Sequence, residues 1–476
     1  MPEQIGEPAS NLAADGGSQL HPDETGGKPG KTYRVGTLEY TVRQLAFLFL
    51  WLLAGDFCWM LFQTIFFMFM PVYMQRLHAD NTTIAVVTGS TAGMVNLLFL
   101  PNISIWTDRY RSRLGRRVPF LLWSTPLTVT ALVLIGYAPN IGAWVHADKI
   151  LPLSVSLTVT VLGVLTVFVV LFHFFNMVLV NSYYFLLRDV VPQSLMPRFL
   201  AWFRVVGTLG AFVLQFWLFQ YVVAYPKVLF WSIGLVYLVS FLLMCWRVKE
   251  GGYPPPPPRE NRRNFIQTYG VYFRECLSIP LYRNFFIAFT LMILVTSPAI
   301  SFMVLFGEKT LGLNADAIGK VFAWSSLASA ILYIPMGYLC EKFNAFHVVL
   351  ASLISGAILT GLAYFFVQSK TTWLIYAVLI IPPTVGWMLG WIAVMMLLFP
   401  GDRFGQFSSG LNVLGYGSLV VTSYLLGSFM DWAHNFRMIF ALCTVLYAAA
   451  AILMLMVYCG WKRHGGPDNY VPPEAP

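Results

Sequence analysis

Asp56 and Arg204 stand out chemically because each is a formal charge inside a long apolar segment. A charge at mid-bilayer depth costs roughly 3 kcal/mol or more unless it is paired or faces a wet cavity, so such a residue is a functional candidate. Desolvation favours the protonated carboxyl of Asp56, which suits a proton-binding site. A carboxylate that accepts beside a guanidinium that donates can also hold sugar hydroxyl groups. The alternatives are a structural ion pair for Asp56 and, for Arg204, a side chain that reaches the inner surface.

Several polar and aromatic residues are candidates to line a substrate site. Trp59 and Gln63 follow Asp56 by one and two helical turns, and His173 and Asn176 share one helix face. Histidine can relay a proton, although a packed, hydrogen-bonded histidine fits equally well. Trp391 offers a ring that stacks on a sugar, while packing is the commoner use of tryptophan in membrane helices. We predict substrate contacts for Asp56, Arg204, Trp59, Gln63, Asn176 and Trp391, and proton coupling through Asp56 and His173.

The composition indicates the class of protein that positions these residues. Of 476 residues, 58% are hydrophobic and 11% are charged. A soluble protein of this length would have a far larger charged share. The chain is therefore expected to cross a membrane many times, and its net charge of +9 is interpreted through topology.

A loop from Asn102 to Phe120 fixes that topology. It holds five arginines between two apolar segments of spanning length. Short basic loops stay in the cytoplasm, and no soluble domain is visible that would carry a nucleic-acid patch. Gly115 lets the loop turn tightly. With both termini cytoplasmic, all Lys and Arg fall on the inner side except Arg76, Lys149, Lys227, Lys309, Lys320, Lys370 and Arg437.

The predicted fold is an all-α membrane protein with twelve transmembrane helices in two six-helix bundles. Residues 1–41 are expected to be a disordered cytoplasmic tail, 42–247 the first bundle, 285–460 the second bundle and 461–476 a terminal tail. The cytoplasmic linker, 248–284, contains the prolines Pro254 to Pro258 and an amphipathic segment from Phe265 to Leu277. Proline is expected to interrupt two helices, at Thr296-Ser297-Pro298 and at Pro382-Pro383.

The basic loop also carries a family resemblance. The order Asp108-Arg109, Arg113, Gly115-Arg116-Arg117, Pro119 resembles the signature between the second and third helices of major facilitator transporters. Its ending is most similar to the glycoside/pentoside/hexuronide cation symporters and to sucrose transporters. The resemblance implies two bundles that alternate access, with this loop as the cytoplasmic gate. We assign the gate to Asp108, Arg109, Arg113, Gly115, Arg116 and Arg117, and to Glu341-Lys342, the weak counterpart of Asp108-Arg109 in the second half.

The same resemblance bears on the substrate and the coupling ion. In the glycoside symporters an aspartate of the first helix and an arginine of the fifth hold the sugar, in contexts that look like those of Asp56 and Arg204. Two acidic residues of their second helix form a cation site, whereas this chain has Asn96 and Leu100 there. With no other acid in the second or fourth helix, a sodium site is not expected. Coupling to a proton through Asp56, or no coupling, are the alternatives left.

The sequence thus predicts a secondary transporter of a saccharide or glycoside in the inner cell membrane, coupled to protons. Its partners would be the substrate, a proton and membrane lipid, with no nucleic acid, cofactor or metal, because the six cysteines lack metal-ligand spacing. No nucleotide-binding loop or catalytic triad argues for an enzyme. The rival functions are an uncoupled facilitator, a carrier of a non-sugar solute, and a transporter-like nutrient sensor.

Overall fold

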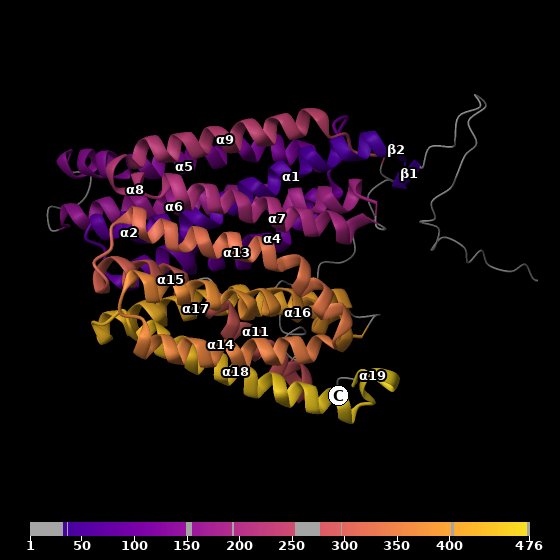
Figure 1. The fold of residues 1–476 in the computed structure, drawn as a ribbon. Helices are drawn as coiled ribbons and strands as arrows, with labels where there is room; N and C mark the ends of the chain where they lie inside the picture. The colour runs from indigo at the N-terminus through magenta and orange to yellow at the C-terminus, as the bar shows by residue number, and fades with distance from the viewer. Residues whose placement is uncertain are drawn as a thin grey trace, which may run out of the picture.

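The computed structural model describes residues 32–35, 37–148, 155–192, 195–252, 277–296, 298–400 and 404–473. Long helices form two groups, which we call the N half (to Arg247) and the C half (from Pro280), and they lie one above the other in Figure 1. The run Pro254 to Pro258 lies outside the described residues, as does the predicted amphipathic segment apart from Leu277.

Polar side chains start several of these helices. Thr41 caps the first helix in a reciprocal arrangement with Gln44, and the side chains of Ser156, Asn314 and Ser369 cap three others.

The N half comprises α1 (Val42–Thr64), the π-helical turn η1 (Ile65–Phe69), α2 (Met70–Arg76), α3 (Asn81–Ala85), η2 (Val86–Ser90), α4 (Thr91–Arg109), α5 (Val118–Ala147), α6 (Leu157–Val190), α7 (Met196–Val213), η4 (Leu214–Leu218), α8 (Tyr221–Ala224) and α9 (Pro226–Arg247).

The C half repeats this pattern of long antiparallel helices. It comprises α11 (Pro280–Thr296), α12 (Pro298–Leu305), η5 (Phe306–Thr310), α13 (Ala315–Lys342), α14 (Ala345–Phe366), α15 (Lys370–Leu379), α16 (Ile381–Leu398), α17 (Phe404–Ala433), α18 (Met438–Arg463) and α19 (Gly466–Asn469). The interruption predicted at Pro382-Pro383 is confirmed, because Ile380 separates α15 from α16. The interruption predicted at Thr296-Ser297-Pro298 stays a prediction, because Ser297 lies outside the described residues.

Eleven helical runs in the described part of the chain are long and apolar enough to cross a membrane. The predicted fifth span is the exception, since its apolar part, Trp202–Leu218, is shorter than these runs. An all-helical membrane architecture is therefore shown, while the count of twelve remains a prediction.

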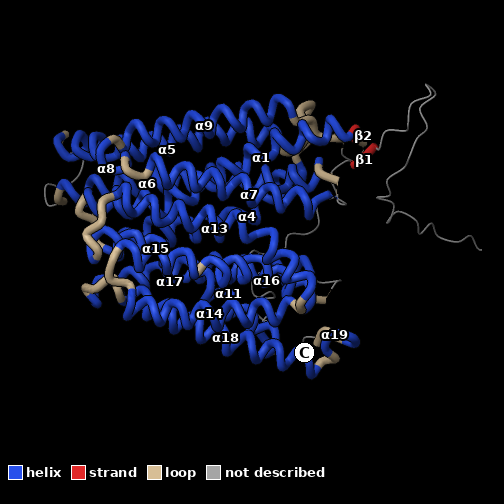
Figure 2. The backbone as a smooth tube through the Cα atoms, in the orientation of Figure 1, coloured by secondary structure: helices blue, strands red, loops and turns tan. Residues whose placement is uncertain are grey.

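The segment before α1 differs from the predicted disordered tail. Here the strands β1 (Thr32–Val35) and β2 (Leu38–Thr41) pair in an antiparallel hairpin. Tyr33, Leu38 and Tyr40 pack against the N-half core, so the hairpin buries apolar side chains that a free tail would expose. The hairpin and α19 lie at the same end of the helices (Figure 2). The predicted terminal tail also begins as helix, because α18 continues to Arg463.

Candidate functional site

A cavity of about 480 Å³ lies between the two halves. Its walls come from the first, second and fourth spans of the N half and from α11 and α17 of the C half. The lining residues are Trp59, Phe62, Gln63, Phe66, Phe67, Thr88, Ala92, Asn96, Leu100, His173, Asn176, Met177, Val180, Asn181, Tyr184, Phe289, Ile293, Asn412, Gly415, Tyr416 and Leu419. None of these described residues carries a formal charge, so the wall combines aromatic rings with neutral amides.

Four of the predicted site residues line this cavity, namely Trp59, Gln63, His173 and Asn176. His173 is only 4% exposed and its ring lies 4.7 Å from that of Phe66. Its Nε2 has no hydrogen-bond partner among the described residues. Asn176 Oδ1 accepts a 2.6 Å hydrogen bond from the Tyr237 hydroxyl, which ties this amide to α9 behind the cavity.

The other predicted contacts lie behind the wall or outside the described residues. The Arg204 guanidinium lies over the Trp59 ring, 5.4 Å from its centre, and is therefore one side chain removed from the cavity. Trp391 packs against Phe289 with ring centres 4.8 Å apart, so Phe289 separates it from the same space. The backbone of Asp56 is part of α1, but its side chain lies outside the described residues.

Hydrogen bonds between the halves gather at one end of the molecule, which we call the far end; the basic loop 110–117 marks the opposite, loop end. At the far end, Asp431 of α17 accepts from the backbone nitrogens of Asn81 (3.1 Å) and Thr82 (2.9 Å) and from the Thr82 hydroxyl (2.6 Å). A Cβ on Gly427, one turn earlier, would lie 2.6 Å from Thr82 Cα, so glycine permits this approach.

Three further contacts join the halves between the far end and the middle of the helices. The hydroxyl of Ser301 donates to Phe67 O at 3.1 Å, that of Ser90 to Val420 O at 2.7 Å, and that of Ser326 to Gln215 Oε1 at 2.7 Å. The cavity extends the other way, since Tyr184 in its wall precedes Asp189, a residue of the loop end, by about 8 Å of helix.

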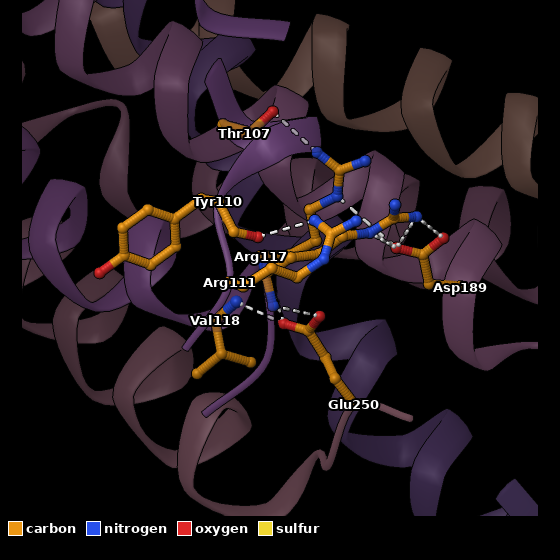
Figure 3. A network of polar contacts seen from close by, with 8 residues as sticks. Thr107, Tyr110, Arg111, Arg117, Val118, Asp189 and Glu250 are labelled. Atoms are coloured by element: carbon orange, nitrogen blue, oxygen red, sulfur yellow. Dashed lines mark hydrogen bonds and ion pairs between the residues drawn. The ribbon is translucent and has the colours of Figure 1, made fainter. Parts of the chain in front are cut away.

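At the loop end, two acidic residues organise the arginines (Figure 3). Arg116 Nε and Nη2 donate to Asp189 in a two-pronged contact of 2.8 to 3.1 Å. Arg117, 3% exposed, donates to Thr107 Oγ1 at 2.7 Å and lies 3.6 Å from Asp189. Glu250, just after α9, accepts from the backbone nitrogens of Arg116, Arg117 and Val118 at 2.9, 2.8 and 2.6 Å. A carboxylate there favours the start of α5, where backbone N–H groups are otherwise unpaired.

Neither acid was among the predicted gate residues. The expectation that the fourth helix carries no acid is wrong, because α6 continues to Val190 and includes Asp189. The helix runs beyond the apolar stretch that defines a span, so hydropathy does not mark its end. The available signal was chemical, since Asp189 and Glu250 are acids beside the basic residues Arg188 and Lys249.

The remaining gate predictions have varied surroundings. Arg109 ends α4, Arg113 is exposed in the loop, and Lys342 ends α13 with its amine 5.9 Å from the Tyr338 ring. The side chains of Asp108 and Glu341 lie outside the described residues.

Gly115 is expected to be intolerant of substitution. Its φ is +104°, and a Cβ would collide with the Glu250 side chain. Gly115→Ala should therefore destabilise the protein by about 2 kcal/mol. Gly312 is the matched control, because its φ is +64° and nothing lies within 4 Å of a Cβ built there. Thermal unfolding of both variants separates the two causes: equal losses would mean that the positive φ, and not the contact with Glu250, sets the requirement.

Comparison with known proteins points to the same architecture. Residues 52–398 match the family model of the Major Facilitator Superfamily. The General alpha-glucoside permease of Schizosaccharomyces pombe is 31% identical over 88 residues, which are 18% of this chain and only 15% of the permease.

Solved structures share the fold at low identity. A mutant of the nucleoside transporter NupG aligns with a TM-score of 0.64 and 9% identity, over 86% of this chain and 100% of that one. A bacterial homologue of the iron transporter ferroportin, in an inward-facing state, gives 0.63 and 16%, over 87% and 98%. An inward-facing, occupied bacterial homologue of the human lysosomal transporter Spinster gives 0.63 and 14%, over 91% and 100%.

Proposed function

Because this chain belongs to the Major Facilitator Superfamily, a family of transporters, we propose that it carries a saccharide or glycoside across the inner cell membrane by alternating access, coupled to a proton. The observation that carries the proposal is the cavity between the halves, with aromatic rings and neutral amides in its wall. Rings suit the apolar faces of a sugar, and amides suit its hydroxyl groups. The short match to an alpha-glucoside permease supports the same substrate class.

The contacts between the halves suggest the state of the transport cycle. The Asp431 contacts join the halves at the far end, and those of Ser301, Ser90 and Ser326 join them between the far end and the middle of the helices. If the basic loop is cytoplasmic, as short arginine-rich loops are, the far end faces outward and this is a cytoplasm-facing arrangement. In the same orientation the hairpin and the C-terminal segment are cytoplasmic, and the network around Arg116 and Arg117 belongs to the inner gate.

Proton coupling through Asp56 has a direct test. External pH is followed in lightly buffered, energy-depleted cells expressing the protein while maltose, sucrose and simple hexoses are added in turn. Symport should alkalinise the medium with at least one sugar, and Asp56→Asn should reduce the signal by about tenfold or more, since the amide cannot bind the proton. The control is Asp316→Asn, which alters a partly exposed far-end carboxylate paired within its own helix.

The outcomes separate the rival functions. Sugar uptake without a pH change would overturn coupling and leave an uncoupled facilitator. A normal pH signal in Asp56→Asn would remove Asp56 from the coupling path. If no sugar enters, the saccharide itself is wrong, and a carrier of another solute or a sensor takes its place.

A further inference from the structure

Two asparagines in the cavity wall are held in defined orientations. Asn96 of α4 and Asn181 of α6 both line the cavity from helices of the N half, and both are partly exposed. Asn96 Nδ2 donates to Ala92 O at 2.9 Å, and Asn181 Nδ2 donates to Met177 O at 2.8 Å. Only the NH₂ end of an amide can donate to a carbonyl, so these bonds fix which way each group is turned.

The two amides therefore offer the same unused groups to a molecule in the cavity. Neither Oδ1 accepts a hydrogen bond from the residues that the structure describes. Each nitrogen also keeps a second N–H. An acceptor and a donor side by side on one planar group match two neighbouring hydroxyls, of which one donates to Oδ1 and the other accepts from the N–H.

Other polar groups of the N-half wall are not available in this way. Asn176 Oδ1 is taken by Tyr237, and the Thr88 hydroxyl donates to Ile84 O at 2.8 Å. His173 Nε2 has no partner in the described residues, but it is buried beside Phe66 and Phe172. Gln63 has no bond that orients its amide among the described residues, so it can adapt to different ligands.

We infer that Asn96 and Asn181 recognise vicinal hydroxyl groups and thereby set the specificity of the cavity. The inference rests on the proposed function, since it takes the cavity as the substrate site, but it concerns diol recognition by two named residues whatever the rest of the substrate is. A site built to hydrogen-bond a hydroxyl rejects an analogue that lacks it, because the polar groups of the site are left unpaired. Deoxy analogues are therefore poor ligands.

The test is equilibrium binding to the purified full-length protein, measured by calorimetry. One probe series is methyl α-D-glucopyranoside with its 2-, 3-, 4- and 6-deoxy analogues, and the other is uridine with 2′-deoxyuridine. The variants are Asn96→Leu and Asn181→Leu, with Asn284→Leu as control, because Asn284 lies on α11 outside the described cavity wall and its amide donates to Met456 Sδ at 3.9 Å. Alanine replaces leucine at either cavity position if the leucine variant does not fold.

Wild-type protein and the control should prefer a parent compound over at least one deoxy analogue by about tenfold or more. Each cavity variant should reduce a preference of this kind to about threefold or less. Preferences unchanged in both variants, or no binding of either series to the wild type, would overturn the inference. Discrimination confined to uridine, and lost in the variants, would support diol recognition while overturning the saccharide proposal. Glucoside binding without uptake in cells would overturn the proposed transport and leave the inference on diol recognition standing.

Discussion

Asp189→Ala is expected to produce the largest loss of stability among the variants considered. The carboxylate is 12% exposed and accepts the two-pronged contact from Arg116, with the nearly buried Arg117 3.6 Å away. Removing one partner from a largely buried pair leaves the guanidinium charges poorly compensated, which costs about 3 kcal/mol. The apparent free energy of unfolding in detergent, from chemical denaturation followed by tryptophan fluorescence, measures the loss.

A double-mutant cycle tests whether the loss comes from this pair. Asp189→Ala combined with Arg116→Ala should cost less than the sum of the two single changes, by about 1 to 2 kcal/mol. Asp316→Ala is the control, since its pair with Lys320 is more exposed than the Asp189 pair and lies within one helix, and it should cost less than about 0.5 kcal/mol. If Asp189→Ala is as mild as this control, the contact does not stabilise the loop end.

Asp431→Ala is expected to loosen the far end on both halves at once. The change removes the acceptor of two backbone N–H groups and one hydroxyl at the start of α3. Hydrogen bonds to a charged group at a partly exposed site sum to about 2 kcal/mol, which is roughly a thirtyfold shift toward the open far end. Hydrogen exchange measured by mass spectrometry should therefore speed up in peptides from α3 and η2 and also in peptides from the C-terminal half of α17.

Asp80 provides a matched control for the Asp431 contacts. It caps the same helix from within the N half, through Thr83 N at 3.2 Å and the Thr83 hydroxyl. Asp80→Ala should accelerate exchange in α3 while α17 stays protected. The same one-sided pattern in Asp431→Ala would mean that Asp431 is a local helix cap and does not hold the halves together.

The sequence was sufficient for the features that depend on local pattern. Apolar runs of spanning length predicted the helices, and prolines predicted the interruption next to Pro382-Pro383, because both effects act within a few turns of one segment. The basic loop identified the family, since its spacing of Asp, Arg and Gly is read along the chain. Segment lengths were less certain, as the ordered hairpin and the extended α6 show.

Tertiary structure alone decided which residues meet. Glu250 reaches the start of α5 across 132 residues or more, and Asp431 reaches α3 across about 350, distances over which sequence spacing carries no information on contact. It also decided that Trp59, Gln63, His173 and Asn176 line one cavity while Trp391 stands behind Phe289. A helix turns its side chains to all sides with a period of 3.6 residues, and only the packing of its neighbours determines which side faces the cavity.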